Sequence, residues 1–81
     1  MRLLLFGQIR DSAEHLHDTE ITSSARSVRE LMGWLCQSDA DLARAFHRAG
    51  LRVAVDQCFV DFDAAITPQS EVAFMSPLSG G

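Results

Sequence analysis

The sequence predicts an α+β fold in which a small sheet carries a helix packed across one face. Three observations support this prediction. Short apolar or alternating runs typical of strands lie toward both ends of the chain, two segments with helical periodicity lie between them, and 81 residues suffice for one domain. Hydrophobic residues make up 47% and charged residues 22%, which excludes a disordered or low-complexity chain. We therefore expect a single domain over residues 1–81.

Two strands are expected in the N-terminal part of the chain. The apolar run over residues 3–6 ends at a glycine and is too short for a helix. Because side chains alternate along a strand, Leu4 and Phe6 should lie on the outer face and the other two leucines in the core. The polar segment 8–17 is expected to be a loop with at most one helical turn. Residues 19–22 alternate around β-branched side chains and predict the second strand.

Two helices are expected in the middle of the chain. Ser27 and Glu30 have the spacing of a capping box, in which the Ser27 hydroxyl accepts from the Glu30 N–H and the Glu30 carboxylate accepts from the Ser27 N–H. Asp39 is a candidate N-cap for a second helix, and Gly50 is its candidate stop. The apolar stripe of the first helix is Val28, Leu31, Met32 and Leu35, and that of the second is Leu42, Ala45, Phe46 and Ala49.

Three further strands are expected over residues 52–55, 58–62 and 71–75, separated by turns at 56–57 and 67–70. In the last strand, Val72 and Phe74 should face the core. If the first and last strands pair in the centre of the sheet, its other face collects apolar side chains. A contiguous apolar patch would mark a partner surface, the alternative being isolated surface residues. The expected members are Leu4, Phe6, Ala54, Phe59, Ala73 and Met75.

Composition narrows the possible functions. The net charge of -4, without a basic run, argues against nucleic acid or an anionic membrane as the partner. The N-terminal apolar run is shorter than a signal-peptide core or a membrane span, and Cys36 and Cys58 match no metal or redox motif, so we expect reduced thiols and a cytoplasmic protein. His15, His17 and His47 lack the spacing of a metal site. No phosphate-binding glycine loop or nucleophile elbow is present, so no catalysis by the chain alone is expected.

The C-terminal stretch EVAFMSPLSGG, the opening MRLLLFGQIRD and the central RVAVDQ carry a family resemblance. Together with the chain length, they resemble the small, sulfur-carrying subunits of molybdopterin synthases, a ubiquitin-like sulfur-carrier family. The resemblance covers essentially the whole chain and implies a β-grasp fold with a flexible C-terminal Gly-Gly tail over residues 76–81. Met75 and Ser76 depart from the family, in which an aromatic residue and a proline are frequent at these positions.

The resemblance implies that the Gly81 carboxylate is the working group. An E1-like adenylyltransferase would activate it with ATP, a sulfur donor protein would convert it to a thiocarboxylate, and the large catalytic subunit, joined with this chain in a heterotetramer, would pass the sulfur to a pterin precursor. The carrier would bind no cofactor or metal stably. Gly80 and Gly81 lack Cβ atoms and fit a narrow channel, while Pro77 stops the last strand. Five residues at roughly 3.3 Å each reach about 16 Å into a partner. The interface residues expected on this basis are Phe6, Arg10, Phe59, Met75, Pro77 and Leu78.

Three alternatives are kept open. A thiazole-pathway (thiamine) sulfur carrier shares the fold and the tail chemistry, but is usually shorter and lacks a clear second helix, so segment 39–49 favours the first hypothesis. A ubiquitin-like protein modifier would use the same activated terminus to form isopeptide bonds. A plain binding module would use only its sheet and would not need its terminal glycines.

Overall fold

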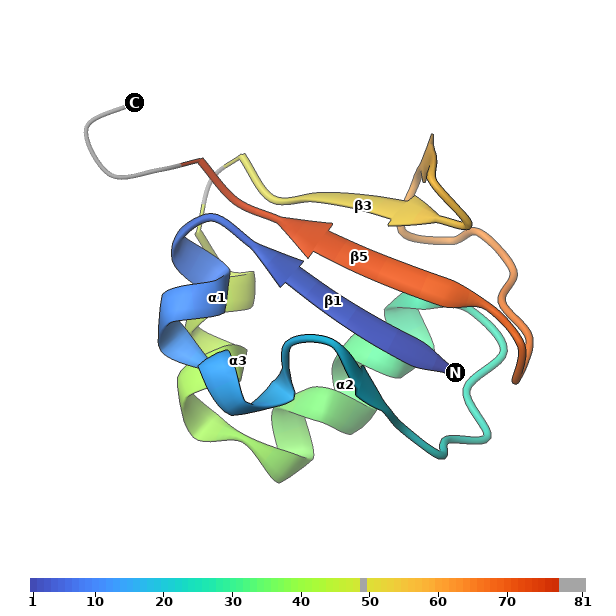
Figure 1. Ribbon diagram of the computed structural model, residues 1–81, viewed down its shortest axis with the longest axis horizontal. Helices are drawn as coiled ribbons and strands as arrows, with labels where there is room; N and C mark the ends of the chain where they lie inside the picture. The colour runs from blue at the N-terminus through green and yellow to red at the C-terminus, as the bar shows by residue number, and fades with distance from the viewer. Residues whose placement is uncertain (49, 78–81) are drawn as a thin grey trace.

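The computed structural model describes residues 1–48 and 50–77. It has a five-stranded mixed sheet in the order β2-β1-β5-β3-β4, with helices packed on one face (Figure 1). The predicted α+β class and the β-grasp fold implied by the resemblance are therefore confirmed. The strands are β1 (Arg2–Phe6), β2 (Thr19–Glu20), β3 (Arg52–Val55), β4 (Cys58–Val60) and β5 (Glu71–Met75). The helices are α1 (Gln8–Ser12), the short 3-10 helix η1 (Glu14–Leu16), α2 (Val28–Ser38) and α3 (Ala40–Phe46).

The first and last strands pair in the centre of the sheet, which is the condition under which the sequence analysis expects an apolar outer face. Strand β1 runs parallel to β5, with Leu3 opposite Val72 and Leu5 opposite Phe74. Strand β3 then pairs with β5 in the antiparallel sense. All four of these side chains are fully buried. The alternation along β1 and β5 therefore points one face of the sheet into the core, and the C-terminal strand is held on both sides.

Side-chain caps begin both long helices. The Ser27 Oγ accepts from the Glu30 N–H at 3.1 Å, and the Asp39 Oδ1 accepts from the Leu42 N–H at 2.9 Å. The second half of the predicted capping box is wrong, because the Glu30 carboxylate accepts from the Arg26 N–H at 3.3 Å. An isolated bridge between residues 27 and 65 holds the incoming chain extended, which leaves the Arg26 N–H within reach of Glu30.

Helices α2 and α3 cover the inner face of the sheet. In the apolar stripe predicted for α2, Met32 is half-buried and the other three side chains are buried. The Phe46 ring of α3 lies 4.9 Å from the Phe74 ring of β5, centroid to centroid. Tilted aromatic pairs at this distance stabilise a core beyond the area they bury. Ala49, expected in the second helix, lies outside the described residues. The buried members of the two stripes are Val28, Leu31, Leu35, Leu42, Ala45 and Phe46.

The segment expected as a loop after the first strand is largely helical. It forms α1 and η1. Of its three apolar side chains, Ile9 and Ala13 are buried in the core, and Leu16 is half-buried against it. Ile9, Ala13 and Leu16 have the i, i+4 and i+7 spacing of a helix, a signal that the expectation of a loop overlooked because the residues between them are polar. Two strands are also shorter than expected. Strand β2 ends at Glu20, and β4 ends at Val60, after which the Asp61 Oδ1 accepts from the Asp63 N–H at 2.8 Å and turns the chain.

Candidate functional site

The chain leaves the sheet at Ser76 and Pro77, which we call the tail root. The Ser76 N–H donates to the Phe6 carbonyl at 3.1 Å, and the Ser76 Oγ accepts from the Ile9 N–H at 2.7 Å. Helix α1 begins after Gly7, which has no side chain to cap it. Ser76, 67 residues from Ile9 along the chain, supplies the missing cap. These two hydrogen bonds fix the direction in which the chain leaves the sheet.

Two glycines pack against the tail root. Gly7 has φ 79° and ψ -151°, and a Cβ atom there would lie 1.8 Å from the Ser76 carbonyl oxygen. Gly50 has φ 85°, and its Cβ would lie 2.8 Å from the Pro77 Cγ. Both backbone conformations are open mainly to glycine, and both contacts leave no room for a side chain. The turn after β1 and the segment before β3 therefore hold the tail root from two sides.

Pro77 is exposed and has no N–H group, so the ladder of β5 ends at the position that the sequence predicts. The remaining predicted tail residues, Leu78, Gly80 and Gly81, lie outside the described residues.

The apolar residues expected on the other face of the sheet come together there, and we call this set the outer face. All six line a depression of about 360 Å³, together with Gln57 and Glu71. Phe59 is 59% exposed and Phe6 is 41% exposed, while Leu4 and Met75 are half-buried. The expected exposure of the two alanines is wrong: Ala54 is 6% exposed and Ala73 is 8% exposed. Their small side chains lie on central strands, below the level of the longer side chains beside them. The six members are Leu4, Phe6, Ala54, Phe59, Ala73 and Met75.

The outer face continues to the tail root. Phe6 lies opposite Met75 across β1 and β5, and Met75 lies opposite Arg52 across β5 and β3. These three residues form a row across the sheet just before the chain leaves it. The Arg52 Cζ lies 4.2 Å from the centroid of the Phe59 ring, a cation–π contact. Any partner that binds the tail close to the sheet therefore contacts this row or lies beside it.

His17 supports the outer face from the edge of β1. Strand β2 is too short to pair with the second half of β1, and the Leu5 N–H donates instead to the His17 Nδ1 at 2.9 Å. This contact requires an Nδ1 atom without a proton. The imidazole also meets the Phe6 ring edge-on at a centroid distance of 5.4 Å. His17 therefore acts as a structural acceptor beside Phe6.

Arg10, an expected interface residue, lies on α1 and forms an ion pair with Glu14 of η1. Its guanidinium donates to both carboxylate oxygens of Glu14, at 3.0 Å from Nε and 3.1 Å from Nη2. The hydrogen bond raises the pKa of Arg10 and lowers the pKa of Glu14. A partner that uses Arg10 would meet a cation whose charge is already compensated.

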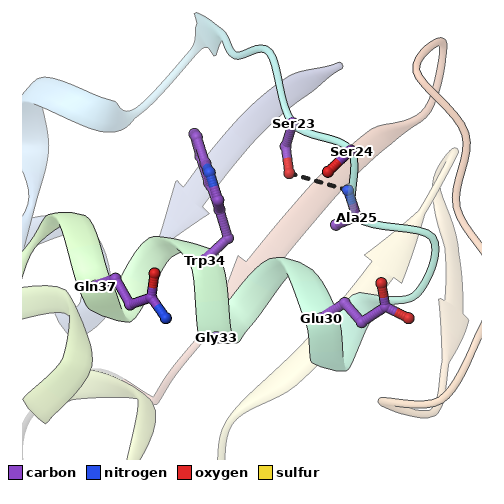
Figure 2. A pocket seen from close by; sticks show the side chains of 7 residues that line it. All are labelled: Ser23, Ser24, Ala25, Glu30, Gly33, Trp34 and Gln37. Atoms are coloured by element: carbon purple, nitrogen blue, oxygen red, sulfur yellow. Dashed lines mark hydrogen bonds between the residues drawn. The ribbon is translucent and has the colours of Figure 1, made fainter.

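A second hollow lies between α2 and the segment before it (Figure 2). Trp34, which the sequence analysis does not single out, stands in it and is 38% exposed. The one carboxylate that lines this hollow in the described residues belongs to Glu30 and already accepts from the Arg26 N–H, while the Ser23 Oγ accepts from the Ala25 N–H at 3.1 Å.

Residues 1–48 and 50–77 contain no group of three or more His, Cys, Asp or Glu side chains placed to hold a metal ion. None of the helices in the described ranges is long and apolar enough to cross a membrane.

Sequence reasoning missed the contacts that hold the tail root in place. Gly7 is recognisable from sequence only as the end of a strand, and Gly50 only as a helix stop. The cap from Ser76 to Ile9 and the contact between Arg52 and Phe59 depend on strand register, and they leave no local signal.

Comparison with known proteins identifies the family of the chain. The sequence model of the ThiS family matches residues 3–81. The chain is also 31% identical over 81 residues to the molybdopterin synthase sulfur carrier subunit of Escherichia coli (strain K12), a match that covers 100% of this chain and 99% of that protein. With its β-grasp fold, its apolar outer face and its tail root, the chain belongs to the ThiS family of sulfur carriers.

Proposed function

We propose that this chain is the sulfur carrier subunit of a molybdopterin synthase and that the carboxylate of Gly81 carries the sulfur. One observation supports this most directly: the apolar outer face reaches the tail root, so a partner can cover the face and receive the tail at once. The relative that shares 31% identity over the full chain bears that function in its name.

The chemistry follows from the properties of a terminal carboxylate. Such a group has an unperturbed pKa of about 3.3–3.7 and at neutral pH is an anion, a poor electrophile. In the proposed sequence, an E1-like adenylyltransferase joins the Gly81 carboxylate to the α-phosphate of ATP and releases pyrophosphate. A sulfur nucleophile supplied by a donor protein then attacks the acyl carbon, a C–S bond forms and AMP leaves. With a protein persulfide as that nucleophile, the product is an acyl disulfide; a thiol then attacks the donor's sulfur, breaks the S–S bond and ends as a disulfide with the donor, which releases the thiocarboxylate. The thiocarboxylate is the nucleophile toward the pterin precursor held by the large catalytic subunit.

The fold contributes to this chemistry by positioning the tail relative to the partner. The outer face offers Phe6 and Phe59, and burying such side chains contributes about 1.5–3 kcal/mol each in general. The tail root, where the tail begins, is held in place by its contacts with Gly7 and Gly50 and by the hydrogen bonds of Ser76. From Pro77 to Gly81 the chain can span about 16 Å at roughly 3.3 Å per residue. The sheet can therefore dock outside a partner while Gly81 enters its channel.

We propose that this sulfur transfer takes place in the cytoplasm and that the chain binds only proteins as partners. The net charge of -4 without a basic run is suited to protein docking and unfavourable for nucleic acid or an anionic membrane. The carrier brings no metal or cofactor to the reaction, and ATP belongs to the activating enzyme.

A thiazole-pathway carrier is the second candidate, because it shares the family and the tail. Helix α3 (Ala40–Phe46), which we expect such carriers to lack, favours the molybdopterin synthase subunit. Complementation separates the two: the gene should restore molybdenum-cofactor synthesis in a strain that lacks its own carrier. Rescue of thiamine synthesis alone would reverse the order. Isopeptide adducts on many cellular proteins would instead indicate a protein modifier.

Removal of Gly81 tests the role of the tail itself. Deletion of this residue, or the addition of one residue after it, should abolish sulfur transfer while the domain keeps its thermal midpoint. Sulfur transfer by the deletion variant would show that the sheet acts without the terminal carboxylate, as a plain binding module would.

A further inference from the structure

Arg52 differs from most other arginines of the chain in its contacts. Its guanidinium lies over the Phe59 ring, 4.2 Å from the centroid. Within residues 1–48 and 50–77, its side chain forms no ion pair and donates no hydrogen bond, although Arg52 is exposed. The arginines that pair with carboxylates are Arg2, Arg10, Arg29 and Arg44.

The stacking on Phe59 leaves the hydrogen-bonding edge of Arg52 available. A guanidinium carries its N–H donors in its plane, so an aromatic ring can cover one face while the donors point elsewhere. The ring also restricts the side chain, which reduces the entropy lost when a partner binds. Arg52 lies opposite Met75, so these donors stand at the end of the outer face from which the tail departs.

Docking on the outer face would remove water from this cation. A buried charge without a partner is strongly unfavourable, whereas a carboxylate matched to the guanidinium fork compensates it with two parallel hydrogen bonds. The six side chains of the outer face are apolar and require an apolar surface, while Gln57 and Glu71 line the same depression. The complementary surface is thus an apolar patch with one acidic side chain at its edge.

We infer that Arg52 is a specificity determinant of the outer face and that it receives an aspartate or glutamate of the large catalytic subunit. The inference rests on the proposed function and adds to it the chemistry of the partner surface. Because Arg52 and the tail root lie at the same end of the sheet, this carboxylate lies beside the mouth of the channel that takes the tail. A protein with an apolar patch but no such acid leaves Arg52 uncompensated and is rejected.

Titration calorimetry with the full chain and the large subunit of the same organism tests the inference. Arg52→Gln keeps a long polar side chain and removes the charge, and it should weaken affinity about tenfold or more. Arg52→Lys keeps the charge but lacks the planar guanidinium fork, so its affinity should lie between those of the wild type and Arg52→Gln. The matched control is Arg26→Gln, which makes the same charge change on an exposed arginine before α2 and should bind like the wild type. Circular dichroism should show all three variants folded at the temperature of the titration.

The outcomes separate the inference from the proposed function. If the wild type does not bind the large subunit, the proposed function fails. If it binds and Arg52→Gln binds equally tightly, the proposed function stands and the role of Arg52 is refuted. Self-association of the carrier that Arg52→Gln abolishes would make a second copy of this chain the occupant and would also refute the inference.

Charge reversal identifies the partner acid. Arg52→Glu should bind more weakly than Arg52→Gln, and one Asp→Arg or Glu→Arg variant of the large subunit should restore its affinity. A scan of the acidic residues at the docking surface in which no reversal restores binding would contradict the assignment of a carboxylate.

Discussion

Replacement of Gly7 by alanine tests how the fold holds the tail root. Gly7 has φ 79° and ψ -151°, and the Cβ of alanine would lie 1.8 Å from the Ser76 carbonyl oxygen. That oxygen belongs to the backbone and cannot rotate away as a flexible side chain does. Gly7→Ala must therefore move the turn after β1, the tail root, or both.

The cost follows from the contacts that would be disturbed. A non-glycine residue in this backbone region costs about 1–3 kcal/mol. Displacement of Ser76 would also weaken or break its hydrogen bonds with Phe6 and Ile9, which contribute about 0.5–1.5 kcal/mol each to stability. We expect a loss of about 2–6 kcal/mol in the free energy of unfolding. A domain of 81 residues has about 4–12 kcal/mol in total, so the variant should be severely weakened.

Urea unfolding followed by circular dichroism measures this loss, and Gly33→Ala is the matched control. Gly33 lies inside α2, and its Cβ would meet nothing within 4 Å. That change should stabilise the domain by about 0.5–1 kcal/mol because alanine favours helix. If Gly7→Ala loses less than about 1 kcal/mol, the tail root is not held as described. The folded fraction of this variant should also transfer sulfur more slowly than the wild type.

Three further predictions concern the outer face, the tail root and the thiols. Phe59→Asp should weaken binding to the large subunit by about tenfold or more, since it places a charge on the apolar docking surface, and unchanged affinity by calorimetry would exclude the outer face as the interface. Ser76→Ala should cost about 0.5–2 kcal/mol and speed hydrogen exchange at the Ile9 amide, whereas Ser76→Thr keeps the cap; equal exchange in both variants would refute the cap. Burial raises the pKa of the Cys36 thiol, which lowers its thiolate fraction at neutral pH, so iodoacetamide should label the exposed Cys58 first, and peptide mapping that finds Cys36 labelled first would contradict this.

Sequence reasoning succeeded where one local rule decides the structure. Alternation along β1 and β5 assigns the core residues, because a buried face allows only one register. The caps at Ser27 and Asp39 are local interactions between residues close together in the chain, and both occur as predicted. The outer face follows from the same alternation once the first and last strands are paired in the centre.

The failures involve contacts between distant segments. Helix α1 itself contains one apolar residue, Ile9, and its cap comes from Ser76 at the opposite end of the chain, so no local capping signal marks its start. The Glu30 carboxylate binds the Arg26 N–H because a bridge to a remote segment positions the incoming chain. The position of Arg52 over Phe59 depends on the register of β3 and β4, which sequence alone does not give.

The central claim is that the terminal carboxylate of Gly81 is the reagent and that the domain exists to present it. Intact-mass analysis of the chain after incubation with its activating enzyme, ATP and a sulfur source tests this most directly. The account predicts a mass increase equal to the difference between one sulfur and one oxygen atom, located at Gly81 by fragmentation of the C-terminal peptide and absent when ATP is omitted. An unchanged mass, or sulfur found on Cys36 or Cys58 instead, would contradict it.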